Sequence, residues 1–324
     1  MQCARSPARH QARGNEGRGE AGAPVLSDEP MIRPDRARRL KPVLDALLDR
    51  EAMARRVQVD PVRFPRRYRR PEDAELVALV SACLAYGRAD LFGAKLEELW
   101  RRVGDGPSEA AKALDPLLDR SFFEGISYRF NSPADLAALF GAAGAVQRES
   151  GSLGAAFAEA FNESGDLRSA LSAFAGRLRR SVPKGVEAAL GPMQGFAHLL
   201  PEPERGGACK RLLLLLRWMV RGGPNDPIDL GLWKGVPASA LLVPLDTHVA
   251  RIALNLGLTR RQDLSWKTAQ DVTASLRQID PEDPVRYDFA LCHHGMSGAC
   301  PRRRSAEACG PCALAPHCRK PAGP

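Results

Sequence analysis

The C-terminal segment of the chain contains four of its eight cysteines, Cys300, Cys309, Cys312 and Cys318. Their spacing is C-x8-C-x2-C-x5-C, and four thiolates in one short loop can bind a tetrahedral zinc ion or an iron–sulfur cluster. A structural zinc ribbon usually presents two CxxC pairs, whereas this loop has a single one. The cysteines therefore predict a metal centre, and their uneven spacing favours an iron–sulfur cluster slightly over zinc.

Lys210 and Asp246 have the residue type and the position for covalent or acid–base chemistry. Lys210 opens the apolar run KRLLLLLRWMV, so it lies near the positive end of a predicted helix, where a lysine can act as an amine nucleophile. The alternative is a lysine that binds phosphate or extends its amine to solvent. Asp246 directly precedes a predicted apolar helix, and from the local sequence alone its most common use is an N-cap.

The segments that carry these residues are predicted to be helical, so we expect an all-α protein. Apolar residues recur at helical spacing, and no useful stretch alternates as a strand would. Gly87 marks a break between two helices, and Gly104 ends the second. Ser132 and Pro133 have the types favoured at an N-cap and at a first helical position. Helices are predicted within residues 40–53, 71–104, 132–150, 152–164, 166–181, 208–222, 246–258, 266–280 and 283–296.

The charge balance points to an anionic partner. The 324 residues include 47 Lys and Arg against 38 Asp and Glu, a formal net charge of +9. Such an excess favours nucleic acid ahead of a membrane surface, although an arginine-rich genome would give the same balance without such a partner. The runs RFPRRYRR (63–70) and CPRRR (300–304) are the strongest candidates for phosphate contacts, with solvated surface as the alternative.

No segment has the length and apolarity of a membrane span, because the run LLLLLRWMV is short and contains Arg217. The first 30 residues lack the apolar stretch of a signal peptide. We therefore expect a cytoplasmic, nucleoid-associated protein without a membrane partner, in which clustered cysteines are metal ligands more often than disulfides. Residues 1–38 are rich in Gly, Arg, Ala and Pro and are predicted to be a disordered leader.

Two of these motifs together resemble one family. The segment PLDTHVARIALNLGL (244–258) is similar to the motif of an aspartate, Thr-His and an arginine found in endonuclease III-like helix-hairpin-helix DNA glycosylases. That family carries a C-terminal four-cysteine loop for a [4Fe-4S] cluster, spaced C-x6-C-x2-C-x5-C, so the first gap is two residues longer here. Weaker similarity continues upstream in residues 75–104. The run GGACKRLLLLLRWMVR followed by DTHVARIA also resembles a bacterial and archaeal family whose domain has no known function.

The resemblance implies a two-lobed helix-hairpin-helix glycosylase-like region over residues 39–320. A barrel lobe would cover about 72–218, and a second lobe would combine about 40–71 with 219–299, followed by the cluster loop 300–318. Double-stranded DNA would lie between the lobes of a monomer. The [4Fe-4S] cluster, with zinc as the alternative, would hold the basic loop and take no part in the chemistry.

The activity implied by the resemblance is base-excision repair by a DNA glycosylase, with AP-lyase action if Lys210 is the nucleophile. Asp246 would stabilise the positive charge that develops at C1′ as the N-glycosidic bond breaks. DNA contacts are expected from Tyr86, Arg88, Gly206, Gly207, His248, Arg302, Arg303 and Arg304. Structural roles are expected for His293 and His294, and an ion pair within the fold for Arg251.

Two departures from the family leave other functions open. The hairpin before Lys210 reads LLPEPERGGACK, which is longer than the usual Leu-Pro-Gly-x-Gly and acidic at Glu202 and Glu204. The segment before the Asp-Thr-His motif contains an insert (222–240), in which Trp233 and Lys234 shape a pocket or, as we favour, cover the barrel. The alternatives to an enzyme are a DNA-binding or damage-sensing protein on the same fold, and a zinc-binding nucleic-acid module.

Overall fold

The Ala- and Leu-rich composition that favours helices forms helices in the computed structural model, which describes residues 31–223 and 225–319. Within these residues every regular element is a helix, and backbone pairing of the β type is limited to isolated bridges. The prediction of an all-α protein is therefore confirmed. None of the helices in the described residues is long and apolar enough to cross a lipid bilayer.

The helices have the following bounds. The α-helices are α1 (Pro34–Asp45), α2 (Arg50–Val57), α3 (Pro71–Leu84), α4 (Ala89–Val103), α5 (Pro107–Ala113), α6 (Pro133–Ser150), α7 (Leu153–Ser164), α8 (Leu167–Arg180), α9 (Val186–Leu190), α10 (Phe196–Leu199), α11 (Lys210–Val220), α12 (Thr247–Leu256), α13 (Trp266–Arg277), α14 (Asp288–Met296) and α15 (Ala306–Cys309). The 3-10 helices are η1 (Pro61–Arg63), η2 (Pro65–Arg67), η3 (Arg120–Phe122), η4 (Pro203–Arg205), η5 (Ala238–Ala240) and η6 (Ala315–His317).

Capping and turn residues set these bounds as the sequence predicts. The Ser132 side chain accepts from the amide of Asp135 and the Asp135 carboxylate accepts in return, which forms a complete capping box at the start of α6. Between α3 and α4 the chain turns at Gly87, where φ is +78°, a conformation that favours glycine. Gly104, at φ +81°, ends α4 in the same way. The predicted breaks are confirmed.

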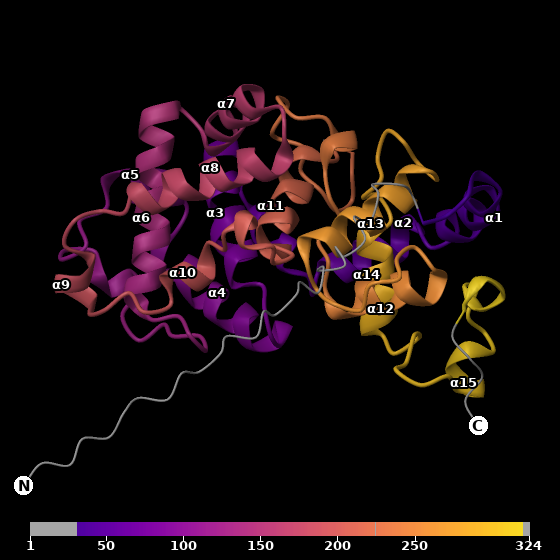
Figure 1. Cartoon of the computed structure of the whole chain (residues 1–324). Helices are drawn as coiled ribbons and strands as arrows, with labels where there is room; N and C mark the ends of the chain where they lie inside the picture. Colours follow the sequence, from indigo (N-terminus) through magenta and orange to yellow (C-terminus); the bar gives the residue numbers. More distant parts are fainter. Residues whose placement is uncertain (1–30, 224, 320–324) are drawn as a thin grey trace, which may run out of the picture.

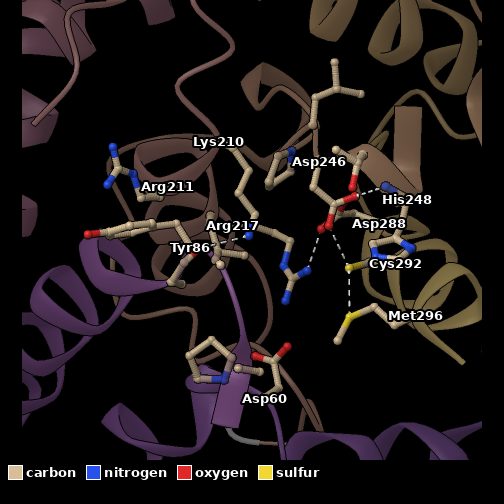
Figure 2. A pocket seen from close by; sticks show the side chains of 18 of the residues that line it. Asp60, Tyr86, Lys210, Arg211, Arg217, Asp246, His248, Asp288, Cys292 and Met296 are labelled. Carbon is tan, nitrogen blue, oxygen red and sulfur yellow. Dashed lines mark hydrogen bonds and ion pairs between the residues drawn. The ribbon is translucent and has the colours of Figure 1, made fainter. Parts of the chain in front are cut away.

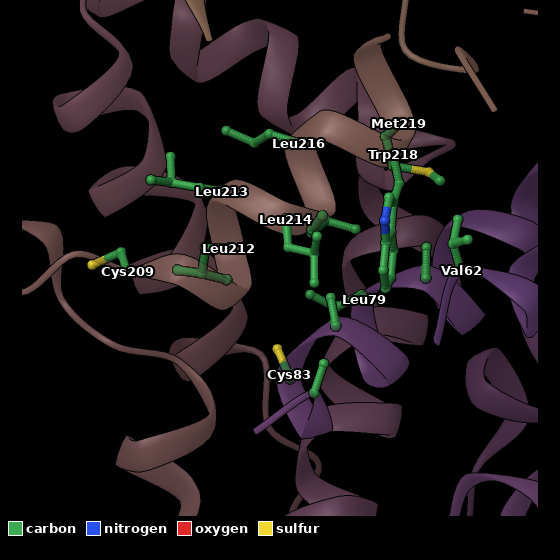
Figure 3. Close-up of a cluster of buried hydrophobic side chains, with 14 of the residues drawn as sticks. Val62, Leu79, Cys83, Cys209, Leu212, Leu213, Leu214, Leu216, Trp218 and Met219 are labelled. Atoms are coloured by element: carbon green, nitrogen blue, oxygen red, sulfur yellow. The ribbon is translucent and has the colours of Figure 1, made fainter. Parts of the chain in front are cut away.

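α11 is the central helix of the core. All residues from Leu212 to Val220 on it are buried, as expected for a helix that is apolar on all sides. Figure 3 shows Leu79 and Cys83 of α3 beside α11, with Trp218 and Val62 in the same cluster. In Figure 1, helices α3 to α10 lie on one side of α11, and α1, α2 and α12 to α15 lie on the other. The buried apolar residues form one continuous cluster through both groups.

The structure bears on the predicted leader and on the insert over residues 222–240. α1 begins at Pro34, so the predicted leader over residues 1–38 extends too far, because Ala37 and Leu40 already bury their side chains and Pro34 suits the first helical position. Residues 1–30 lie outside the described part of the chain. In the insert, Trp233 is buried, stacks on Phe157 at 5.6 Å and donates its indole N–H to Glu75 at 2.9 Å. Trp233 therefore packs onto the core, but with Lys234 it also lines a separate cavity of about 200 Å³, so the choice between cover and pocket stays open.

Candidate functional site

A cavity of about 730 Å³ lies where the two helix groups meet at α11. Its walls include five segments that are far apart in the sequence, as Figure 2 shows for the labelled side chains. They are the approach to η1 with Asp60, the α3–α4 turn with Tyr86, the start of α11 with Lys210, the start of α12 with Asp246, and α14 with Cys292. The structure therefore brings together both predicted catalytic residues, which are far apart in the sequence.

Helical spacing explains which side chains of α11 and α14 reach this cavity. On α11 three of the lining residues, Lys210, Leu214 and Arg217, follow the i, i+4, i+7 spacing of one helix face, and Arg211 lies beside them. On α14 the lining residues include Asp288, Cys292 and Met296, at i, i+4 and i+8. Sequence reasoning missed Arg217, Asp288 and Cys292. The periodicity could have found them, because it places each on the same face as another polar or sulfur-containing residue.

The Asp246 carboxylate uses its two oxygens differently. Oδ1 accepts from the backbone amides of His248 and Val249, both at 2.8 Å, which is the N-cap of α12. Oδ2 accepts from the thiol of Cys292 at 3.2 Å. Burial, and then the negative charge of Asp246, raises the pKa of the Cys292 thiol well above its ordinary value, so this thiol stays protonated and donates. The cap predicted from the local sequence is confirmed, and one oxygen still faces the cavity.

Lys210 is the first residue of α11, as predicted. Its amine lies 3.4 Å from the carbonyl oxygen of Ala85, a long hydrogen bond. Among the described residues it forms no ion pair with a carboxylate. The preceding residue, Cys209, has φ +48°, which is unusual for a residue with a Cβ. The amine is therefore held at the cavity wall without a strong partner.

Arg217 is the centre of a buried ion-pair network behind the cavity. Its guanidinium contacts Asp288 Oδ2 at 2.6 Å and Asp229 Oδ1 at 3.1 Å, and all three side chains are buried. Arg221 binds the second oxygen of Asp229 and also Asp283. Despite its ion pair with Arg217, burial raises the pKa of Asp288 to about 6. A buried charge without a partner would be very costly, so this network keeps the end of α11 in place.

Tyr86, predicted to contact DNA, stands at the cavity wall with a cluster of aromatic and basic side chains. Its hydroxyl lies 2.7 Å from Asn131 Oδ1 and its ring packs at 4.7 Å from that of His198, another cavity residue. The ring of Phe130 also packs against His198, with ring centroids 5.3 Å apart, and Phe130 is 63% exposed. Arg129, at φ +54°, holds its guanidinium near the rings of Tyr86 and Phe130. Sequence reasoning missed this turn.

The acidic hairpin before α11 is balanced by arginines of α8. Arg179 pairs with Glu202, and Arg168 pairs with Glu204, at 3.4 and 3.5 Å. The acidic side chains therefore stabilise the turn and do not make it repel an anionic partner as strongly as the sequence suggests. Gly206 has φ +81°, and a Cβ placed at Gly207 would meet nothing within 4 Å. The DNA contact predicted at these glycines stays a prediction.

The other residues predicted to bind DNA are placed as follows. His248 lines the cavity, and its ring nitrogen is 3.2 Å from Arg251. Arg251 does not have the carboxylate partner predicted for it within the described residues, because its guanidinium is directed to His248 and the Gly295 carbonyl. Arg88 is exposed and pairs with Asp90. Exposed positions in the C-terminal loop are taken by Arg302, Arg303 and Arg304.

Several arginines of the basic run 63–70 form ion pairs or hydrogen bonds within the fold. Arg67 forms a two-fold contact with Glu97 at 2.8 Å, and Arg70 pairs with Glu109 at 3.1 Å. Arg66 donates to the carbonyl oxygen of Ile228 at 2.9 Å. These contacts hold the segment between α2 and α3 against its neighbours, so the run is a weaker candidate for phosphate contacts than the sequence suggests.

The four cysteines of the C-terminal loop all line one small, largely apolar cavity of about 30 Å³ beside α12 and α14. Asn255 of α12 contacts Cys300 Sγ at 3.5 Å, and His294 of α14 contacts Cys312 Sγ at 3.6 Å. Residues 31–223 and 225–319 contain no group of three or more His, Cys, Asp and Glu side chains arranged to hold a metal ion. The thiols therefore surround one space without converging on a single point.

The loop is fixed to the helices that carry the larger cavity. Arg36 of α1 donates to the carbonyl oxygens of Leu256 at 2.7 Å and His317 at 3.1 Å, which joins α12 to the loop. The amide of Arg319 donates to the carbonyl of Asn255 at 2.6 Å. His293, expected to be structural, is buried against Phe289 and contacts Asp60 at 3.3 Å. These contacts tie the loop to the end of α12.

Comparison with known proteins assigns the chain to a family. A family model described as Protein of unknown function (DUF2400) matches residues 60–297. The matched segment includes Lys210, Asp246 and Asp288 of the cavity and ends before the four-cysteine loop. No curated protein and no solved structure matches the chain. Because the match covers more than half of the sequence, the protein belongs to the DUF2400 family.

Proposed function

We propose that this protein is a DNA glycosylase with a two-lobed helix-hairpin-helix fold, which removes a damaged or mismatched base from double-stranded DNA. The observation that carries the proposal is the position of Lys210 and Asp246 on the wall of one cavity. Its volume of about 730 Å³ is within the range of about 300–1,000 Å³ usual for small-ligand sites. α10, η4 and α11 would form the hairpin, and the helix groups on either side of α11 would form the lobes.

The chemistry follows from the two side chains. A base inside a duplex has to be extruded before its glycosidic bond can be reached. In the cavity, Oδ2 of Asp246 would face the sugar and stabilise the positive charge that develops at C1′. The thiol of Cys292 orients that oxygen. The amine of Lys210 would attack C1′ and form a Schiff base, which permits strand cleavage as well as base release.

The cysteine loop is proposed to hold a [4Fe-4S] cluster on Cys300, Cys309, Cys312 and Cys318. Four thiols around one cavity are the donor set that such a cluster needs. A single zinc ion bound by the same four sulfurs, each about 2.3 Å from the metal, is the alternative. The cluster supplies ligand bonds that brace the loop, and through α12 and α14 the loop braces Asp246.

The proposal is tested with duplexes that each carry one deaminated, oxidised or alkylated base. Base release and borohydride trapping are scored for the wild type and for Lys210→Gln. We expect wild type to release at least one base and to form a trapped covalent adduct. Lys210→Gln should form no adduct, because an amide cannot form the Schiff base.

Each outcome of this panel has one meaning. If the adduct persists in Lys210→Gln, another amine is the nucleophile. If wild type releases a base but is never trapped, Asp246 activates water and the lysine binds phosphate. If wild type binds duplex but neither releases a base nor is trapped across the panel, the glycosylase proposal is wrong, and a DNA-binding protein is left.

The exposed turn at Arg129 and Phe130 gives a prediction about base extrusion. The two residues form the tip of a tight turn closed by reciprocal backbone hydrogen bonds between Tyr128 and Asn131, both at 2.9 Å. Asn131 also donates to Gly195 at 2.9 Å, so the base of the turn is fixed. An aromatic ring on such a support, beside a cavity, can insert into a base stack that opens toward the cavity.

Phe130→Ala should therefore weaken binding to a duplex with a single damaged base by about 10-fold, since base–aromatic stacking contributes about 1–3 kcal/mol. The affinity is measured by fluorescence anisotropy at fixed salt. Leu118→Ala is the control, because Leu118 is 78% exposed and does not line the cavity. Equal affinities for Phe130→Ala and wild type would mean that the ring does not enter DNA.

A further inference from the structure

Asp288, a residue of the large cavity's wall, has a carboxylate oxygen with no role in the proposed reaction. Asp288 Oδ2 is paired with Arg217, but Oδ1 is buried and has no hydrogen-bond partner. The residue is 3% exposed and lines the same cavity as Lys210 and Asp246. Buried polar atoms are nearly always hydrogen-bonded, so this unpartnered oxygen, on a residue of the cavity wall, calls for an explanation such as a catalytic role.

The two carboxylates of the cavity have different environments. Asp246 accepts three hydrogen bonds, two from backbone amides and one from a thiol, so both of its oxygens are occupied as acceptors. Asp288 has one oxygen paired with Arg217, and its other oxygen has no hydrogen-bond partner. Pairs of carboxylates in unequal environments commonly divide the work of charge stabilisation and proton transfer.

We propose that Asp288 is a second catalytic carboxylate, whose Oδ1 accepts a proton from the Lys210 ammonium and returns it to the leaving group. The inference rests on the proposed function. Asp288 is the first residue of α14, and Lys210 is the first residue of α11, so both side chains start from helix N-termini at the cavity. The two residues also line the same cavity.

The step can be written for an abasic sugar, where the leaving group is water. Lys210 gives one ammonium proton to Asp288 Oδ1, and the nitrogen lone pair forms a bond to C1′ of the open-chain aldehyde. A second N–H proton moves to the aldehyde oxygen. Asp288 then returns its proton to that oxygen, the C–O bond breaks to release water, and the C=N bond of the Schiff base forms. Lys210 must be deprotonated before it can attack, so removing the acceptor slows trapping.

The step requires ionised Asp288, so its pH dependence has a definite sign. Burial raises the pKa of Asp288 to about 6, and below that pH the carboxyl is already protonated and cannot accept from Lys210. Trapping should therefore rise with pH through an apparent pKa of about 6. The charged or titratable groups around Asp288 are Lys210 and Arg217 on α11, Asp246 before α12 and Cys292 on α14, with Asp229 and Asp60 facing Arg217.

The experiment measures the rate of borohydride trapping on a duplex with a single abasic site, as a function of pH. Asp288→Asn keeps the shape and an oxygen for Arg217 but cannot take up the proton. We expect trapping to slow by about 10²-fold or more and the limb near pH 6 to disappear, as for loss of a positioned proton acceptor. Asp283→Asn is the matched control, because Asp283 belongs to the same arginine network through Arg221 and does not line the cavity.

Two further measurements guard against a folding defect. Asp288→Ala should regain trapping when formate is added, since formate can enter the cavity and supply a carboxylate. The wild-type pH profile needs no variant at all, and a profile without a limb near pH 6 would overturn the proposal. So would an Asp288→Asn variant that is trapped like wild type.

The glycosylase proposal is judged separately, by base release from the damaged-base panel. Wild type that releases a base but is not trapped on the abasic duplex would overturn the Lys210–Asp288 relay and leave the glycosylase standing. Wild type that is trapped normally but releases no base would overturn the glycosylase proposal and leave the Lys210–Asp288 relay standing.

Discussion

Asp246→Asn is expected to abolish base release while the protein still folds and binds duplex DNA. The amide oxygen of asparagine can accept from the amides of His248 and Val249 as Oδ1 does now, and Asn caps helices about as well as Asp. The second oxygen, which accepts from Cys292, is replaced by an amide nitrogen without charge. The loss should be about 10²-fold or more in single-turnover base release, the effect of removing a positioned charge.

Asp166→Asn is the control for this prediction. Asp166 is the N-cap of α8, where its side chain accepts from the amide of Ser169 at 2.8 Å, and it does not line the cavity. Both variants should unfold within about 1 kcal/mol of wild type, and only Asp246→Asn should lose activity. If the two variants release base equally well, Asp246 is a helix cap and nothing more.

The helices of this protein are predictable because local chemistry determines them. Ser132 caps α6, Gly87 and Gly104 turn the chain around α4, and Lys210 opens α11, all as local sequence preferences require. The start of α1 at Pro34 was missed because the leader before it has the composition of a disordered segment, and only the burial of residues such as Leu40 reveals the helix.

The site was predictable only in part, because half of it depends on tertiary contacts. Lys210 and Asp246 stand out through their places at helix starts. Asp288 was passed over because an acidic residue at the start of a helix normally needs no further explanation. Its free oxygen depends on Arg217 binding the other one, and Arg217 in turn looks in the sequence like an interruption of an apolar run. The unpartnered oxygen of Asp288 therefore follows from a contact with Arg217 that the sequence does not indicate.

The exposed turn shows the same limit. Phe130 is one of several aromatic residues between α5 and α6, and no pattern in the sequence marks it. Its significance comes from His198 and Tyr86, which lie far along the chain and support the ring beside the cavity. The basic run 63–70 shows the opposite error. In the sequence Arg67 and Arg70 are candidates for phosphate contacts, but in the fold they form ion pairs with Glu97 and Glu109.

Cys309→Ser and Cys312→Ser are each expected to yield poorly folded protein that lacks iron. Both thiols line the small cavity against α12, and ligand bonds to a cluster contribute directly to the free energy of folding. Anaerobically purified wild type should be yellow-brown and contain about four irons per chain. Each variant should lose most of the iron and the colour, and should melt at a lower temperature in thermal unfolding.

The control is Cys83→Ala, which removes a sulfur from the buried core beside α11 and leaves the loop untouched. It should keep the full iron content and lose only the modest stability expected for a small change in core volume. Stoichiometric zinc without iron in wild type would contradict the cluster and favour a zinc module. Variants that fold and melt like wild type, with no metal in either, would mean that the thiols are not ligands. In that case contacts such as those of Arg36 and Arg319 hold the loop on α12.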